Sequence, residues 1–184
     1  MNKTFKARLS YDWIYYVSVV ILSIVIWMAA FSLYHMPKNY EKLTIFFAGN
    51  VIDYSFEDDA KAHLEDKGVL QVEIASCATD SFAFENKYNV VGLNNSDLVL
   101  VPISIANKTA CSLTFVEIND NYDCSYFTQE NKNYGIVVKK DLLSKYFTFN
   151  DEDYVVMING GSVNAGDITT NAYDLVKWMV GYEN

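Results

Sequence analysis

Arginine is almost absent from this chain of 184 residues: Arg8 is the only one, so 13 lysines carry nearly all of the positive charge. The whole chain has 14 basic and 23 acidic residues. With Lys3, Lys6, Arg8 and Asp12 set aside, 11 lysines face 22 acidic residues, a net charge of −11. Such a surface repels nucleic acid and anionic lipid, and it lacks the side chain best suited to bidentate phosphate binding. We therefore expect no nucleic-acid partner.

Histidine is scarce as well, and so are the sequence motifs of common enzymes. The chain has only His35 and His63, and it contains no His-Glu-x-x-His, Gly-x-Ser-x-Gly or lysine-bearing phosphate loop. Cys77 and His63 are the one pair that could act as nucleophile and base, and we expect both to be structural. Asp120, Asn121 and Asp123 are the best cation candidates but fall well short of an EF-hand pattern. We predict no catalytic residues, no metal site and no cofactor, and hence a protein that is not an enzyme.

Cysteine occurs only three times, at Cys77, Cys111 and Cys124. Cys111 and Cys124 flank twelve residues and could close a disulfide, which their spacing alone leaves open. Cys77 ends an apolar run and is expected to be a small buried hydrophobic residue.

The long apolar run Trp13 to Tyr34 is the most informative feature that is present. Its 22 residues include no charge. As a helix it would be roughly 33 Å long, enough to cross a hydrocarbon core of about 30 Å. Aromatic residues lie towards both ends, where the headgroup zone favours them. Lys3, Lys6 and Arg8 precede the run, which predicts a cytoplasmic N-terminus.

The expected organisation follows from this run. Residues 1–12 form a cytoplasmic tail, 13–35 a transmembrane helix, 36–41 a short stalk, and 42–184 an extracytoplasmic domain of ordinary size. The alternative is a cleaved signal peptide, but the run exceeds the usual h-region and ends in a poor cleavage site. We favour an uncleaved anchor in the lipid bilayer of the cell membrane.

Strand-like and helix-like segments alternate along residues 42–184. Apolar runs without polar alternation, at 98–101 and 154–158, are typical of strands covered on both faces of a parallel sheet. Helices are expected after Ser55, from Ser81 to Tyr88 and after Thr170, and further strands at 43–48, 69–75, 113–118 and 134–139. This order predicts a three-layer α/β domain with a mostly parallel sheet.

A ligand site is expected from the strand order alone. In open α/β sheets, ligands bind beyond the carboxyl ends of the strands. The loops that follow the predicted strands are rich in glycine, amide and hydroxyl residues, which let a polar ligand approach the backbone. The predicted ligand-binding residues are Gly49, Asn50, Thr79, Asp80, Ser104, Gly160, Gly161 and Ser162.

The domain resembles one lobe of an extracellular solute-binding protein of the ABC-transporter type. The resemblance is carried by Lys42-Leu43-Thr44-Ile45-Phe46, by Ser96-Asp97-Leu98-Val99-Leu100-Val101-Pro102, by Tyr134-Gly135-Ile136, and by Tyr154-Val155-Val156-Met157-Ile158-Asn159 with its Gly-Ser loop and helix. It implies a periplasmic-binding-protein-like lobe with ligand contacts on the loops named above. Such proteins close two lobes on a solute, and this chain has residues for one lobe.

Two functions are therefore weighed. A single lobe covers one side of a small ligand, whereas good pockets bury roughly 70–90% of it. This favours a non-catalytic accessory protein that docks on a membrane protein complex, with an ABC transporter permease as one candidate partner. The alternative is a solute-binding or sensing lobe for a small polar ligand, completed by a second copy of the chain.

Overall fold

The computed structural model describes residues 3–34, 36–119, 124–166 and 168–181. The chain divides into two compact units, Met1–Met36 and Pro37–Asn184. The first holds helix α1 (Lys3–Tyr34), which begins ten residues before the apolar run. Among the described residues, one helical stretch, Trp13–Tyr34, is long and apolar enough to cross a membrane.

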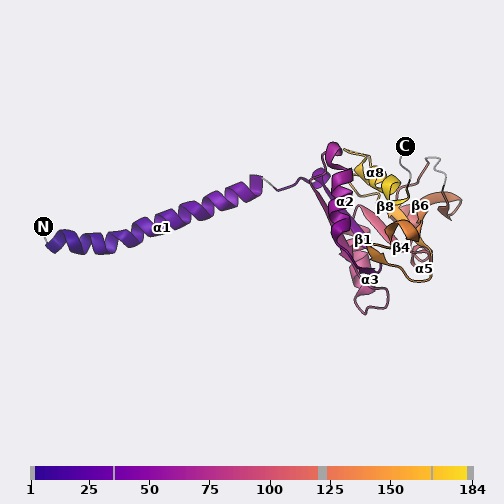
Figure 1. The fold of residues 1–184 in the computed structure, drawn as a ribbon, viewed down its shortest axis with the longest axis horizontal. Coiled ribbons are helices and arrows are strands. Elements are labelled where there is room, and N and C mark those ends of the chain that lie inside the picture. Colours follow the sequence, from indigo (N-terminus) through magenta and orange to yellow (C-terminus); the bar gives the residue numbers. More distant parts are fainter. Residues whose placement is uncertain (1–2, 35, 120–123, 167, 182–184) are drawn as a thin grey trace. The chain divides into compact units, whose positions relative to one another are not determined.

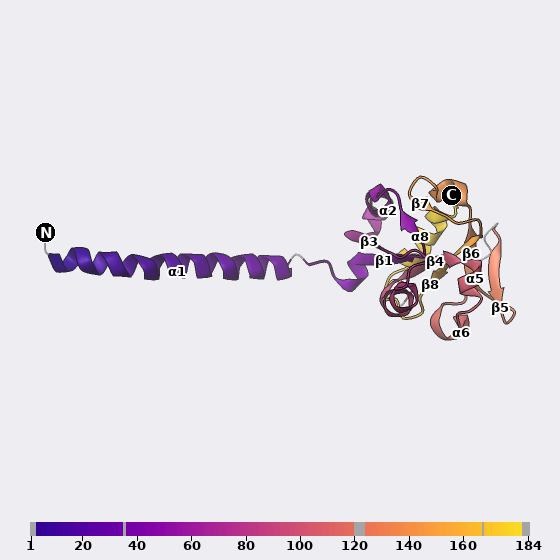
Figure 2. The ribbon, with the colours of Figure 1, turned by 90° about the horizontal axis from the view of Figure 1, so that it is seen from below.

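The second unit is an α/β domain built on a six-stranded sheet in the order β3-β1-β4-β8-β6-β5. Strands β3 and β5 are the two outermost strands of this sheet (Figure 2). The strands are β1 (Lys42–Phe47), β3 (Gln71–Ser76), β4 (Leu98–Pro102), β5 (Tyr126–Gln129), β6 (Lys132–Val138) and β8 (Tyr154–Ile158). A two-stranded sheet pairs β2 (Asn50–Val51) with β7 (Phe147–Thr148).

Helices cover both faces of the large sheet (Figure 1). The α-helices are α2 (Ser55–His63), α3 (Phe84–Lys87), α4 (Leu93–Asn95), α5 (Ile103–Ala106), α6 (Cys111–Thr114), α7 (Lys140–Leu143) and α8 (Asn171–Met179). Single turns are η1 (Asn39–Glu41) and η2 (Glu65–Lys67), and η3 (Tyr88–Gly92) is a π-helical turn.

Alternate residues of the strands enter two separate cores. Leu43, Ile45 and Phe47 of β1 face the core formed with α2 and α8, and Phe46 faces the core formed with α3, η3, α5 and α6. All five residues of β4 and of β8 are buried. The predicted three-layer α/β domain is therefore confirmed, with a mixed sheet in which most strands run in one direction.

The direction of β8 differs from the prediction. Strands β1, β3 and β4 are parallel, but β8 pairs antiparallel with both β4 and β6. After β6, residues 139–153 hold only α7 and β7. These elements do not carry the chain back to the end of the sheet where β6 began. Strand β8 therefore starts at the end of the sheet where β6 ends, and it runs antiparallel to β6.

Several shorter elements also depart from the predictions. The helix expected at 81–88 begins later, at Phe84, and the helical segment continues through η3 and α4 to Asn95, seven residues past the predicted end. The strand expected at 113–118 is instead α6 followed by one isolated bridge from Phe115 to Asn159. Strand β5 was not among the predicted strands.

The expected cap of α2 is also different. The helix begins at Ser55 itself, and the Ser55 backbone N–H donates to the Asp53 carboxylate at 2.8 Å. Gly68 adopts a left-handed conformation at the end of η2.

Candidate functional site

Two edges of the sheet bear the loops that were expected to form one site. The carboxyl ends of β1, β3, β4 and β6 share one edge, here called the carboxyl edge. Because β8 is antiparallel to its neighbours, its carboxyl end lies at the opposite, amino edge. Residues that follow β8 are therefore separated from those that follow the other strands.

This separation corrects the predicted grouping of site residues. Gly49, Asn50, Thr79, Asp80 and Ser104 follow β1, β3 and β4 and belong to the carboxyl edge, whereas Gly160, Gly161 and Ser162 follow β8 and belong to the amino edge. The expectation that all eight share one edge is wrong, because it assumed a parallel β8.

The carboxyl edge carries the largest of the cavities described here, an open groove of about 870 Å³. We call it the carboxyl-edge groove. One wall comes from the loop after β3 with α3 and η3, and the other from α5 and α6. Of the predicted residues, Thr79 and Ser104 line it. Gly49, Asn50 and Asp80 do not, and Asn50 is instead paired with Thr148 in the β2–β7 ladder.

A buried aromatic pair supports one wall of the groove. The rings of Phe84 and Tyr88 stack with centroids 5.7 Å apart, and both residues are buried. The Tyr88 hydroxyl and the Thr109 hydroxyl form a hydrogen bond of 2.8 Å, which ties η3 to the loop after α5. Burial raises the pKa of Tyr88 above its ordinary value, so the phenol remains neutral near pH 7. The ring pair and this hydrogen bond thus join the wall made by α3 and η3 to the loop after α5.

The mouth of the groove combines apolar and charged side chains. Phe82 is fully exposed and Leu113 is 87% exposed, and both line the groove. Glu152 accepts a hydrogen bond from the Ser104 backbone N–H at 3.3 Å. Glu85 and Lys108 add one charge of each sign. A polar ligand with an apolar part, or a protein surface, matches this mixture better than a bare ion does.

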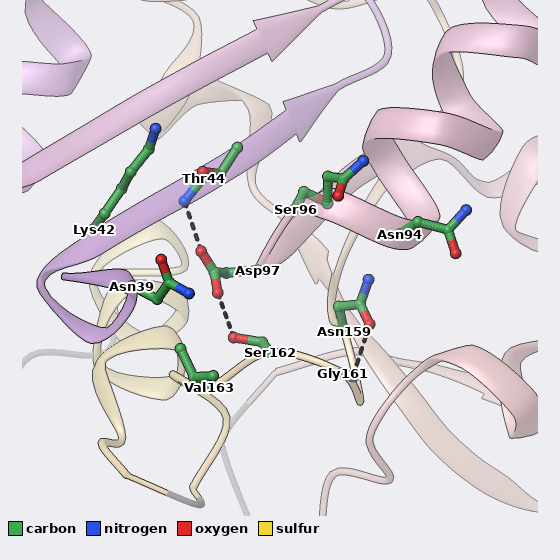
Figure 3. Close-up of a pocket in the computed structure, with 11 residues that line it drawn as sticks. Asn39, Lys42, Thr44, Asn94, Ser96, Asp97, Asn159, Gly161, Ser162 and Val163 are labelled. Carbon is green, nitrogen blue, oxygen red and sulfur yellow. Dashed lines mark hydrogen bonds between the residues drawn. The ribbon is translucent and has the colours of Figure 1, made fainter.

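The amino edge carries a smaller, polar cavity of about 330 Å³, drawn in Figure 3. We call it the amino-edge cavity. At its centre, the Asp97 carboxylate accepts hydrogen bonds from the Thr44 backbone N–H at 2.7 Å and from the Ser162 hydroxyl (Figure 3). It also accepts one from the Asn164 amide at 3.1 Å. Ser162 and Asn164 are buried.

These bonds give the amino-edge residues a structural role. Asn164 also donates to the Lys42 carbonyl at 2.9 Å, so the loop after β8 is tied to the starts of both β1 and β4. Asn159 donates to the Leu93 carbonyl and accepts from the Gly161 backbone N–H. The predicted site residue Ser162 is also bonded within the fold: its hydroxyl donates to Asp97 and accepts from the Asn164 N–H, and its backbone N–H donates to the Asn159 carbonyl.

The remaining candidates are placed as follows. Cys111 is a free, buried thiol, so the disulfide with Cys124 is not formed. Burial raises the pKa of Cys111 to about 11. The Cys77 thiol is also free, and its residue packs against the core that contains Phe46. His63 stacks on Trp178 with centroids 5.7 Å apart. His35 and the cation candidates Asp120, Asn121 and Asp123 lie outside the described residues.

Sequence reasoning missed most of the groove lining. Phe82, Leu113 and Glu152 belong to no binding motif, and the predicted strand at 113–118 placed Leu113 in the sheet. The helix predicted at 81–88 also included Phe82, which lies instead in the loop before α3.

Comparison with protein-family models finds no match, and comparison with curated proteins finds none either. Solved structures give partial matches. An ABC substrate-binding protein of Listeria monocytogenes, Lmo0181, determined in complex with cycloalternan, matches with 16% identity and a TM-score of 0.35, over 56% of this chain and 32% of that chain. UspC of M. tuberculosis matches with 14% identity and a TM-score of 0.36, over 56% of this chain and 30% of that chain. This chain thus covers about a third of the length of either protein.

Proposed function

We propose that this protein is a membrane-anchored, non-catalytic binding lobe that holds a polar ligand in the carboxyl-edge groove. The observation that carries the proposal is the groove itself: about 870 Å³, open, and lined by hydroxyl, charged and apolar side chains at the edge where α/β sheets bind ligands. The apolar helix α1 would keep the lobe at the membrane, with the lobe on the extracytoplasmic side.

The open shape of the groove supports a shared site. The walls from η3 and α6 cover a ligand from two sides and leave the mouth exposed. A second molecule would cover the rest, either another copy of this chain or a membrane protein. Tethering both molecules to one membrane would raise their effective concentration and so strengthen a weak pairing.

The test is ligand binding by the intact protein in nanodiscs. A library of amino acids, sugars and nucleosides would be screened by thermal shift, and hits confirmed by calorimetry. Ser104→Trp places a bulky ring in the groove at an exposed position, so it should weaken binding at least tenfold. Ser144→Trp, at an exposed serine outside the groove lining, is the matched control and should bind normally. Equal binding by both variants would contradict the proposal.

Docking on a membrane transport complex is a second candidate function. It is favoured by Phe82 and Leu113, two large apolar side chains exposed at the mouth of the groove. Exposed aromatic and aliphatic side chains of this kind anchor protein interfaces. A Phe82→Ser/Leu113→Ser variant should lose a partner that co-purifies with the unmodified protein in mild detergent. Recovery of the same complex with that variant would exclude this surface.

A further inference from the structure

The carboxyl-edge groove continues along the domain rather than ending beside β4. A second cavity of about 600 Å³, here called the middle cavity, shares four residues with it, Asn89 and Leu93 from one wall and Leu113 and Thr114 from the other. Because both walls are shared, the two cavities adjoin across their full width.

The middle cavity in turn adjoins the amino-edge cavity. Asn94 of α4 lines both, and so do Asn159 and Gly161 of the loop after β8. Asn94 and Asn159 are both labelled in Figure 3. Shared lining residues thus link the three cavities, here together called the channel, from the carboxyl edge to the amino edge of the sheet.

The channel is long enough for an extended chain. Its lining extends from Asn94, which precedes β4 in the chain, to Ser104, which follows it. Strand residues rise about 3.3 Å each, so the five residues of β4 alone account for roughly 17 Å. An extended peptide of about five residues has the same length.

The lining of the middle cavity favours a peptide over other polymers. Its described lining residues include none that is charged, which disfavours a polyanion. Asn94 donates one amide hydrogen to the Asn89 carbonyl, and Asn159 donates one to the Leu93 carbonyl and accepts from the Gly161 N–H. Each of these two amides keeps a second N–H and a second lone pair, with which it can pair with a peptide bond. Leu93 and Leu113 stand on opposite walls and offer apolar contacts to side chains that alternate along an extended strand. Among its described lining residues the only aromatic one is Phe115, which is 5% exposed, so a sugar would find no open ring to stack on.

We propose that the ligand of this channel is an uncharged segment of polypeptide, bound in extended conformation along η3 and α6. This inference rests on the proposed function and deepens it, because the carboxyl-edge groove then receives one end of the peptide. The affinity must grow with peptide length until the channel is filled.

The test measures retention of peptides by the full chain, immobilised in nanodiscs of neutral lipid. The probes are pools of capped peptides of three, five and seven residues, composed of Gly, Ala, Ser, Asn and Leu, and maltoheptaose is the control polymer. Retained molecules are quantified by mass spectrometry. Seven-residue peptides should be retained at least tenfold more than three-residue peptides.

Three variants locate the binding. Ser112→Trp fills the middle cavity from an exposed position and should lower retention of seven-residue peptides at least tenfold. Asn89→Ala removes one amide partner and should lower it about fivefold. Ser144→Trp should leave it unchanged. Unchanged melting temperatures of the variants show that folding is intact.

The outcomes separate this inference from the proposed function. Equal retention of all lengths, no effect of Ser112→Trp, or retention of maltoheptaose in place of peptides would each overturn the peptide channel. If single solutes still bind and Ser104→Trp still abolishes their binding, the proposed function stands without it. If neither solutes nor peptides bind, both are wrong.

Discussion

At the scale of single residues, Asp97 joins three segments that are distant in the sequence, although no motif marks it. Its carboxylate accepts from a backbone N–H of β1 and from two buried side chains of the loop after β8. A buried donor that loses its acceptor costs the free energy of its desolvation. The polar cavity in Figure 3 is thus centred on a hydrogen-bonded junction between segments distant in sequence.

Asp97→Ala should therefore lower the free energy of unfolding by about 3 kcal/mol, because it leaves the Thr44 N–H and the Ser162 hydroxyl without their acceptor and removes one of the acceptors of Asn164. Urea unfolding, followed by near-ultraviolet circular dichroism of the protein in mild detergent, would measure the loss. Asp151→Ala, at an exposed carboxylate, is the control and should change the value by less than about 0.5 kcal/mol. A similar small change for Asp97→Ala would show that the junction does not stabilise the fold.

The carboxylate of Asp59 makes the stability of the domain depend on pH. The Tyr146 hydroxyl donates to Asp59, and this bond, with help from Lys145, lowers the pKa of Asp59 below its ordinary 3.8. A depressed pKa contributes stability that is present above the unfolded value and is lost as the pH falls through the folded value. Tyr146→Phe should bring the pKa of Asp59 back towards its ordinary value and flatten this loss at pH values below 3.8. Carboxyl carbon NMR titration would measure it, and an unchanged pKa would exclude the bond.

At the scale of elements, the apolar pattern of the sequence predicted which strands are buried, but it did not predict the direction of β8. The runs at 98–101 and 154–158 were expected to be buried strands, and β4 and β8 are buried throughout. A strand buried on both faces has the same apolar pattern in either direction, so the pattern could not reveal that β8 is antiparallel.

Other missed elements depend on contacts that are distant or unusual. The π-helical turn η3 is followed by Asn94 and Asn95, whose side-chain amides donate to the carbonyls of Asn89 and Val90, five residues back. No helical periodicity encodes such bonds. The wrong direction predicted for β8 also affected the predicted site. Thr79 and Ser104 line the carboxyl-edge groove, whereas the residues after β8 lie at the amino edge: Gly160, Gly161 and Ser162.

The tight pairing of β6 with β8 gives a prediction at this scale. A Cβ atom added at Gly135 would lie 2.4 Å from Val155 Cγ1 and 2.9 Å from the Val156 carbonyl oxygen. Gly135→Ala should therefore destabilise the domain by about 1–3 kcal/mol, through overpacking rather than backbone strain. Thermal unfolding would measure it. Val155→Ala in the same chain should relieve part of the loss, and simple addition of the two losses would contradict the packing explanation.

At the scale of the whole molecule, the chain joins an apolar helix to an acidic α/β domain. Trp13–Tyr34 is long enough to span a membrane, and the lysines and arginine before it favour a cytoplasmic start. A domain with a net charge of −11 would be repelled by anionic headgroups. We expect it to stand off the membrane surface rather than lie on it.

This orientation is testable with a membrane-impermeant maleimide on intact cells. In a Cys77→Ser/Cys124→Ser background, only the buried Cys111 remains among native thiols, and its raised pKa disfavours reaction. Lys38→Cys should be labelled from outside, and Thr4→Cys should be labelled only after the cells are lysed. Labelling of Thr4→Cys in intact cells would reverse the predicted topology.

Hydrogen–deuterium exchange tests the central claim, that the groove is where this protein meets its ligand or partner. The full chain would be compared in native membrane vesicles, where its natural occupant is present, and after purification into nanodiscs. The account predicts slower exchange in the vesicles for residues 79–93 and 103–114, which form the groove walls, and unchanged exchange in α8 on the opposite face. Slowed exchange confined to α2 and α8, with the groove walls unaffected, would contradict it.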